Sequence, residues 1–177
     1  MRQIDITELL CSRGTGKSYV AGLPKNDLSN PIAEAAPVAQ EATPVLNSLL
    51  GAAGVVYLDF DGETVSGTNW NASYNGGDDI AAVTSGYSTA EIERVWNGIA
   101  EDYRPFNLNV TTDRNVYEAT PTHRRIMIIF TTTFDWYGAF GGVAYLSSFS
   151  SPYFDDPAWV FTPNTGDAAG AAEAGAH

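Results

Sequence analysis

Three acidic residues around the end of one apolar segment form the first candidate site. Asp59, Asp61 and Glu63 occupy alternate positions, and the apolar run before them ends at Asp61-Gly62. Alternation places side chains on one face of an extended segment, where carboxylates can bind calcium or act as a pair in acid–base chemistry. Acidic residues at strand ends more often cap the chain or face solvent, so both interpretations stay open.

The second candidate is His177, at the end of a run of small residues. Ala168 to Ala176 contains only Ala, Gly and one Glu, and Asp167 stands where it can cap a helix. Such a helix can lie very close to a sheet and would deliver the imidazole near its exposed end. The other histidine, His123, is followed by two arginines whose charge opposes a metal ion, so we interpret it as a surface residue.

A third pattern, Arg13 to Ser18, resembles a phosphate-binding loop without its context. That pattern requires a glycine where Cys11 stands, a strand before it and a helix after it. We therefore interpret this segment as a flexible basic tail and exclude nucleotide hydrolysis. Cys11, the only cysteine, has the chemistry of an inhibitory zinc-binding thiolate, but its surroundings favour a tail residue with no special role.

Hydrophobic periodicity predicts a mixed sheet with helices packed on it. Ser88 and Glu91 form a capping box, and apolar residues at helical spacing follow until Pro105. A strand–helix–strand start implies a right-handed parallel pair, and residues 61–86 are predicted as a long loop with room for one hairpin. Runs of β-branched and aromatic residues predict five strands, at Val55–Phe60, Leu108–Thr112, Ile126–Phe130, Val143–Phe149 and Ala158–Phe161.

The domain organisation expected from the sequence is one domain behind a linker. Residues 21–50 carry prolines at regular intervals, which prevents a long helix and favours an extended, poorly packed chain. We expect a flexible tail and linker over residues 1–50, with a short helix near Val45–Leu50, and the folded domain over residues 51–177.

Charge and hydropathy exclude two classes of partner. Residues 51–177 hold five Arg, no Lys and sixteen Asp or Glu, a net charge of −11 out of −12 for the whole chain, which would repel nucleic-acid phosphates. No apolar run reaches the roughly 18 residues that a membrane span needs. An acidic, lysine-poor composition rich in small polar residues is typical of bacterial extracellular proteins, so the expected location is secreted or at the cell surface.

Several stretches together resemble the metzincin clan of zinc metallopeptidases, in a secreted bacterial branch. Val56–Gly62 resembles the first strand of the catalytic domain, and Trp96–Thr112 resembles its long helix, Tyr-x-Pro-Phe turn and second strand. Gly141–Tyr145 resembles the edge strand that borders the cleft, and Gly170–His177 the start of the zinc helix. The resemblance implies an α+β (α/β-like) fold, the N-terminal part of a zincin subdomain: a mixed, twisted five-stranded sheet, one long backing helix and the start of the active-site helix.

The resemblance also implies a zinc-dependent endopeptidase acting on proteins or peptides. His177 would be the first zinc ligand of an H-E-x-x-H motif, and zinc would activate a water molecule. Gly142, Val143, Ala144 and Tyr145 would align a substrate peptide as an added strand. The general-base Glu and the other ligands would lie beyond His177, so no catalytic residue is assigned here. This chain by itself is expected to be inactive and to bind zinc weakly.

Two other functions stay open. A secreted binding or adhesion module would contact glycans or proteins through exposed aromatic side chains, namely Trp70, Tyr74, Trp136 and Tyr137. A structural domain of a large surface protein would carry calcium, the second candidate cofactor, at its acidic loops.

Overall fold

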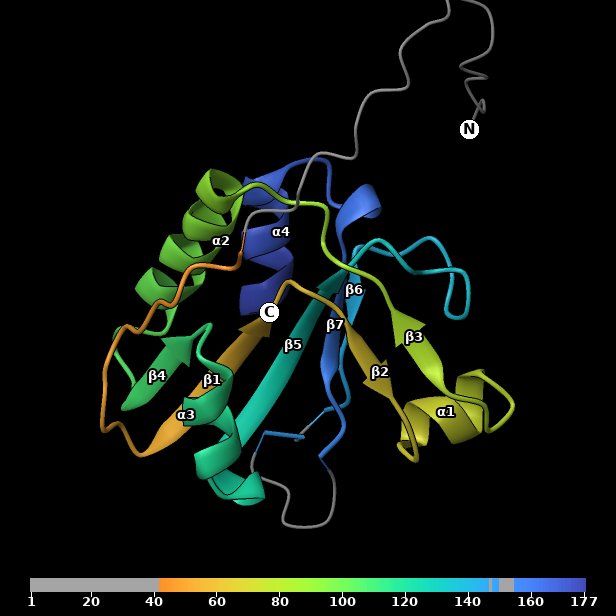
Figure 1. The fold of residues 1–177 in the computed structure, drawn as a ribbon, viewed down its shortest axis with the longest axis horizontal. Helices are drawn as coiled ribbons and strands as arrows, with labels where there is room; N and C mark the ends of the chain where they lie inside the picture. The colour runs from red at the N-terminus through yellow and green to blue at the C-terminus, as the bar shows by residue number, and fades with distance from the viewer. Residues whose placement is uncertain (1–41, 147, 150–154) are drawn as a thin grey trace, which may run out of the picture. The chain divides into compact units, whose positions relative to one another are not determined.

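A five-stranded sheet forms the centre of the computed structural model, which describes residues 42–146, 148–149 and 155–177 (Figure 1). Its strand order is β4-β1-β5-β7-β6. The first four of these strands are parallel, and β6 runs antiparallel to β7. The prediction of a mixed five-stranded sheet is therefore confirmed. The strands are β1 (Gly54–Asp59), β4 (Leu108–Thr111), β5 (Arg125–Thr131), β6 (Gly142–Val143) and β7 (Ala158–Phe161).

Two capped helices lie side by side on one face of this sheet (Figure 1). Helix α2 (Thr89–Asp102) follows β3 and leads into β4, and Glu91 Oε2 accepts hydrogen bonds from Ser88 N and Ser88 Oγ, as the capping-box pattern predicts. Helix α4 (Ala168–Ala176) begins at Asp167, whose carboxylate accepts from the first backbone N–H groups. Among the described residues, no helix has the length and apolar character of a membrane span.

Apolar side chains fill both faces of the sheet. Because side chains alternate along a strand, β1 sends Val56 and Leu58 toward α2 and α4, and Val55 and Tyr57 toward the opposite face. Strands covered on both sides read as nearly continuous apolar runs, which is why β1 and β5 were recognisable in the sequence.

The opposite face is covered by small elements that the sequence analysis largely missed. Hairpin strands β2 (Glu63–Val65) and β3 (Ile80–Ala82) enclose helix α1 (Asn69–Tyr74), and helix α3 (Arg114–Ala119) follows β4. Only the hairpin was anticipated. A helix of six residues has too few turns to show a 3.6-residue period, so the pattern gave no signal for α1 or α3. The two 3₁₀ turns, Thr122–Arg124 and Thr162–Asn164, were likewise not predicted.

The segment before β1 corrects one prediction. Residues 45–50 form no helix. Residues 45–47 run along β4 and residues 48–50 turn away in a bend, with Thr112 N donating to Leu46 O (3.1 Å) and Ser48 N to Val110 O (3.0 Å). The side chain of Asn109 accepts from two backbone N–H groups of this segment, Ser48 N (3.0 Å) and Leu49 N (2.9 Å). The outer edge of β4 offers unpaired backbone groups, and pairing with them outweighs local helix propensity. Residues 1–41, with Cys11 and Arg13–Ser18, lie outside the described residues.

The second correction concerns the fourth strand, predicted at Val143–Phe149. In the structure β6 ends at Val143, and the described residues from Ala144 to Phe149 are not in a strand. Side-chain exposure still alternates from Gly142 to Tyr145 as in a half-exposed strand.

Small residues allow α4 to pack closely. A Cβ built on Gly175 would lie 2.8 Å from Ile99 Cδ1 and 3.0 Å from Phe130 Cζ, and one on Gly98 would lie 3.0 Å from Ala172 Cβ. Near the start of α4, a Cβ on Gly170 would lie 2.1 Å from the backbone oxygen of Thr165. Glycine is therefore required by the packing at these three positions.

Replacing Gly170 by alanine tests this requirement. Helix propensity alone favours alanine by about 1 kcal/mol, but the added Cβ meets a backbone oxygen that cannot move aside. We expect Gly170→Ala to lower the free energy of unfolding by about 1–3 kcal/mol in urea denaturation. Ala169→Ser, at the exposed neighbouring position, is the control and should leave the midpoint unchanged. An unchanged or higher midpoint for Gly170→Ala would contradict the close approach.

Candidate functional site

His177 is exposed at the end of α4 and lies at one end of a groove between α2 and α4. Its backbone N–H donates to Glu173 O (3.3 Å), and the Tyr103 hydroxyl donates to Ala176 O (3.3 Å), which ties the end of α4 to the end of α2. The groove has a volume of about 650 Å³. It is lined by Arg94, Gly98, Glu101, Asp102, Ala169, Ala172, Glu173, Ala176 and His177.

The described residues supply one imidazole for a metal at this place. A catalytic zinc ion takes three protein ligands, and no three His, Cys, Asp or Glu side chains gather to hold a metal within the described part of the chain. The residues present do not by themselves hold zinc. The other histidine, His123, is exposed in the Thr122–Arg124 turn, as expected of a surface residue.

Two of the predicted substrate-aligning residues, Gly142 and Val143, form strand β6 at one edge of the sheet, and the other two, Ala144 and Tyr145, follow it. Gly142 and Ala144 are exposed, and Val143 and Tyr145 pack on the cluster opposite α4, with Tyr145 4.0 Å from the Trp70 ring. A Cβ on Gly142 would lie 2.6 Å from Trp159 O, so this position accepts only glycine. The residues that line the groove beside His177 come from α2 and α4. The described part of the chain therefore does not bring the edge strand and His177 into one pocket.

The aromatic residues expected to be exposed are mostly inside. Trp70 is 1% exposed, and its indole N–H donates to Pro157 O (2.7 Å). Trp136 and Tyr137 are half-buried around it, at ring distances of 6.0 Å, and only Tyr74 is exposed. The expectation of an exposed Trp70 is wrong because this ring fills the space between the sheet and α1.

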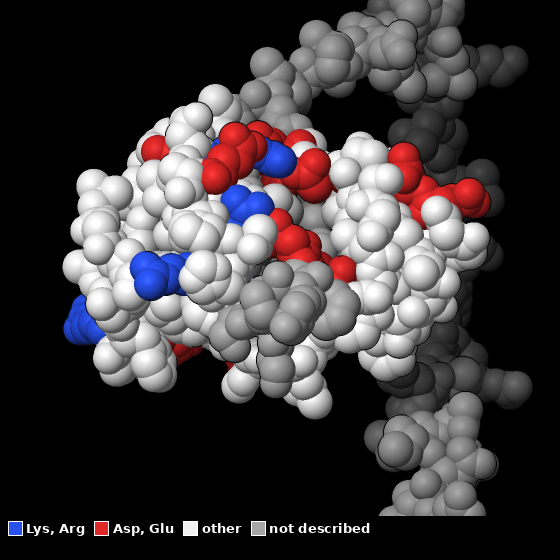
Figure 2. Space-filling model, turned by 90° about the horizontal axis from the view of Figure 1, so that it is seen from below, with Lys and Arg blue, Asp and Glu red and all other residues white. Residues whose placement is uncertain are grey.

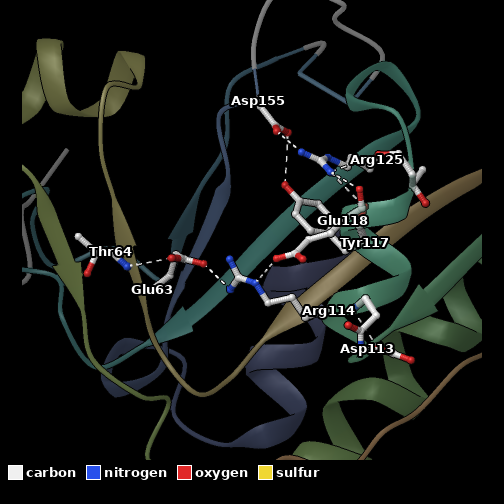
Figure 3. A network of polar contacts seen from close by, with 10 residues as sticks. Glu63, Thr64, Asp113, Arg114, Tyr117, Glu118, Arg125 and Asp155 are labelled. Atoms are coloured by element: carbon white, nitrogen blue, oxygen red, sulfur yellow. Dashed lines mark hydrogen bonds and ion pairs between the residues drawn. The ribbon is translucent and has the colours of Figure 1, made fainter.

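The acidic trio divides into two parts. Glu63 forms an ion pair with Arg114 (2.5 Å), which also pairs with Glu118 of α3 (2.9 Å; Figure 3). Asp59 is fully buried at the end of β1, and its Oδ1 accepts from Asp61 N and Gly62 N, both at 3.1 Å. Of the predicted trio, Asp59 and Asp61 thus remain as a pair, and Glu63 belongs to a neighbouring network.

A second arginine, Arg125 at the start of β5, holds α3 and the residue Asp155 together. Arg125 pairs with Asp155 (2.6 Å), and its guanidinium lies 4.2 Å from the ring centroid of Tyr117 (Figure 3). The Tyr117 hydroxyl donates to the other oxygen of Asp155 (3.3 Å). Sequence analysis missed both arginine networks because their partners lie 30 and 51 residues away along the chain.

Burial changes the chemistry of Asp59. Loss of hydration is the main cause that raises the pKa of this carboxyl from 3.8 to about 7, and the hydrogen bond and negative charge of Asp61 contribute in the same direction. The two backbone N–H groups act in the opposite direction but are outweighed. Asp59 is therefore a carboxyl that gains and loses a proton near neutrality.

Acidic side chains outnumber basic ones in this chain. Figure 2 shows acidic side chains spread over one face, with basic side chains beside them near its centre, which agrees with the net charge of −12. No family model, curated protein or solved structure shows a significant match to this chain.

The pKa of Asp59 predicts how stability depends on pH. Between about pH 4 and pH 7 the folded chain keeps a proton that the unfolded chain has lost, so stability falls as pH rises, by up to about 1.4 kcal/mol per pH unit. Above the folded pKa both states are ionised and the effect ends. Asp59→Asn does not titrate and keeps an acceptor for the two N–H groups.

Urea unfolding of both proteins in metal-free buffer, across that pH range, measures the effect. The free-energy difference between wild type and Asp59→Asn should shift steadily against the wild type as pH rises. A difference that is the same at every pH would show that Asp59 does not hold its proton in the fold.

Proposed function

We propose that this chain is the N-terminal part of the catalytic domain of a secreted zinc-dependent endopeptidase of the metzincin type. The observation that carries the proposal is the placement of His177. It ends a helix of small residues that packs directly on the long helix α2 and on a mixed sheet with an antiparallel edge strand. That combination is what the resemblance in four separate stretches of sequence leads one to expect.

The packing of helix α4 determines the position of the His177 imidazole. Gly98, Gly170 and Gly175 let the helix lie against its neighbours with no room for larger side chains, and the Tyr103 hydroxyl holds its last turn. In this proposal His177 is the first zinc ligand, and the general-base Glu and the remaining ligands lie outside these 177 residues. Zinc, when bound, lowers the pKa of a coordinated water molecule and polarises the substrate carbonyl.

Strand β6 is the proposed alignment edge for protein or peptide substrates. Its pairing with β7 leaves its other side without a neighbouring strand among the described residues. An extended peptide can add to such an edge through backbone hydrogen bonds, with little demand on its sequence. Exposed Gly142 and Ala144 leave room for the approach.

The binding-module alternative loses most of its basis. Its proposed contact residues are largely interior, with Trp70 buried and Trp136 and Tyr137 packed around it. Tyr74 is the one residue of these four that is exposed, with 48% of its surface accessible.

The proposal predicts what a longer product of the same gene does. We expect the codons after His177 to continue in frame as Glu-x-x-His, and the longer product to cleave casein only with zinc present. His177→Ala in that product should reduce cleavage to background, because a catalytic zinc with one ligand fewer is not retained. His123→Ala is the matched control and should keep full activity, since His123 is an exposed turn residue.

The 177-residue chain should show no zinc-dependent cleavage in the same assay. Zinc-dependent cleavage by this chain, or full activity of His177→Ala, would contradict the assignment of His177. A stop codon directly after His177 would contradict the peptidase proposal as a whole.

A further inference from the structure

Residues 44–49, which we call the clasp, are tied to β4 by hydrogen bonds that involve side chains on both sides. The Thr112 hydroxyl, directly after β4, accepts from Leu46 N (2.8 Å). Asn109 is 1% exposed, and its Nδ2 donates to Asn47 Oδ1 (2.9 Å), while its Oδ1 accepts from two further backbone N–H groups of the clasp. The buried polar side chains at this edge therefore serve to hold the clasp.

The clasp buries little apolar surface. Val45 is 71% exposed and Leu49 is 47% exposed, and no residue of the clasp belongs to either apolar cluster of the described residues. A hydrogen bond within a protein contributes little net free energy, because both of its groups bond to water when they separate. The clasp can therefore open at a much lower free-energy cost than unfolding of the whole domain.

Beneath the clasp lies the outer edge of β4. Val110 N donates to Ser48 Oγ (2.8 Å) and Val110 O accepts from Ser48 N (3.0 Å), so both backbone groups lose their partners when the clasp opens. The strand residues Leu108–Thr111 include no charged residue and no proline, the features that commonly prevent another chain from pairing with an edge. The clasp itself covers this edge, and its sequence shows what the edge can bind.

We propose that the β4 edge is a strand-addition site that can exchange its own clasp for the clasp of a second copy of this chain. The fit identifies the partner, because residues 44–49 of any copy carry the groups that pair here. Such an exchange forms the same hydrogen bonds again and costs no contact. The inference is independent of the proposed peptidase, since it uses neither His177 nor β6.

The connection between the clasp and β1 permits this exchange. Residues 50–53 form it, and among them Gly51 is exposed, with a φ of +81°. A Cβ added to Gly51 would meet no heavy atom within 4 Å, so no packing holds this residue in place. Glycine also has the widest choice of backbone angles. Rotation at Gly51 can therefore direct the clasp away from its own β4.

A labelled peptide with the sequence of residues 42–50 stands in for the second copy. In the wild type the attached clasp competes at a high effective concentration, so the peptide should bind weakly. Ser48→Pro in the chain removes the N–H that donates to Val110 O and leaves β4 unchanged. In fluorescence anisotropy this variant should bind the peptide roughly tenfold or more tightly than the wild type, because its own clasp competes less.

Val45→Pro is the matched control. It places proline in the same clasp, at a residue whose N–H makes no hydrogen bond to the described residues, so this chain should bind the peptide as the wild type does. A peptide that itself carries the Ser48→Pro change should bind to none of the three chains. Equal peptide affinity of wild type and Ser48→Pro, or no binding by Ser48→Pro, would overturn the proposal.

Sedimentation equilibrium tests the second copy directly. The wild type and Val45→Pro should form dimers as the concentration rises, and Ser48→Pro should remain monomeric because it has no competent clasp to donate. If Ser48→Pro fails to fold, Asn47→Ala, which removes the acceptor of Asn109 Nδ2, takes its place with changes in the same direction. A wild type that stays monomeric up to about 1 mM, the effective concentration that a short linker provides, would exclude the second copy as partner and overturn the proposal.

Discussion

The central strands β1 and β5 are apolar on both faces, and the rest of the structure depends on covering both. Two helices, α2 and α4, cover one face of the sheet. Together with the strands they bury a single large cluster that includes Leu58, Ile99 and Phe130. The other face has only short pieces, each too small to be stable alone: a two-stranded hairpin, α1 and α3. This difference between the faces determines where hydrogen bonds and ion pairs between side chains are needed.

These hydrogen bonds and ion pairs lie on the face that is covered by the hairpin, α1 and α3. Arg114 links the hairpin to α3, Arg125 links α3 and β5 to Asp155, and Asp156 accepts two hydrogen bonds from Asn69 at the start of α1. Surface ion pairs contribute little individually. Here they act with buried rings such as Trp70 and Tyr117, so charge pairing sets the positions and apolar burial supplies most of the free energy. The buried Asp59 belongs to the same pattern, because it fixes the turn where the hairpin begins.

The opposite, tightly packed face carries the proposed catalytic element. Glycine and alanine let α4 approach α2 and the sheet, which places His177 at a defined point of the surface and not on a loose terminus. Val143 of the edge strand β6, and Tyr145 after it, pack on the cluster of the other face. The two parts of the proposed active site are thus supported by different clusters and share only the sheet between them.

The sequence by itself determined the elements whose signal is local: α2 from its capping box and apolar period, β1, β4, β5 and β7 from their apolar runs, and the cap of α4 at Asp167. Tertiary structure alone decided the rest. Residues 45–47 pair with the edge of β4 because that edge was open to them, Trp70 became a core residue because α1 presses it onto the sheet, and Glu63 left the acidic trio because Arg114 lies opposite. The physical reason is the same in each case. Helix caps and hydrophobic periods depend on residues a few positions apart, whereas burial and charge pairing depend on partners that only the folded chain brings together.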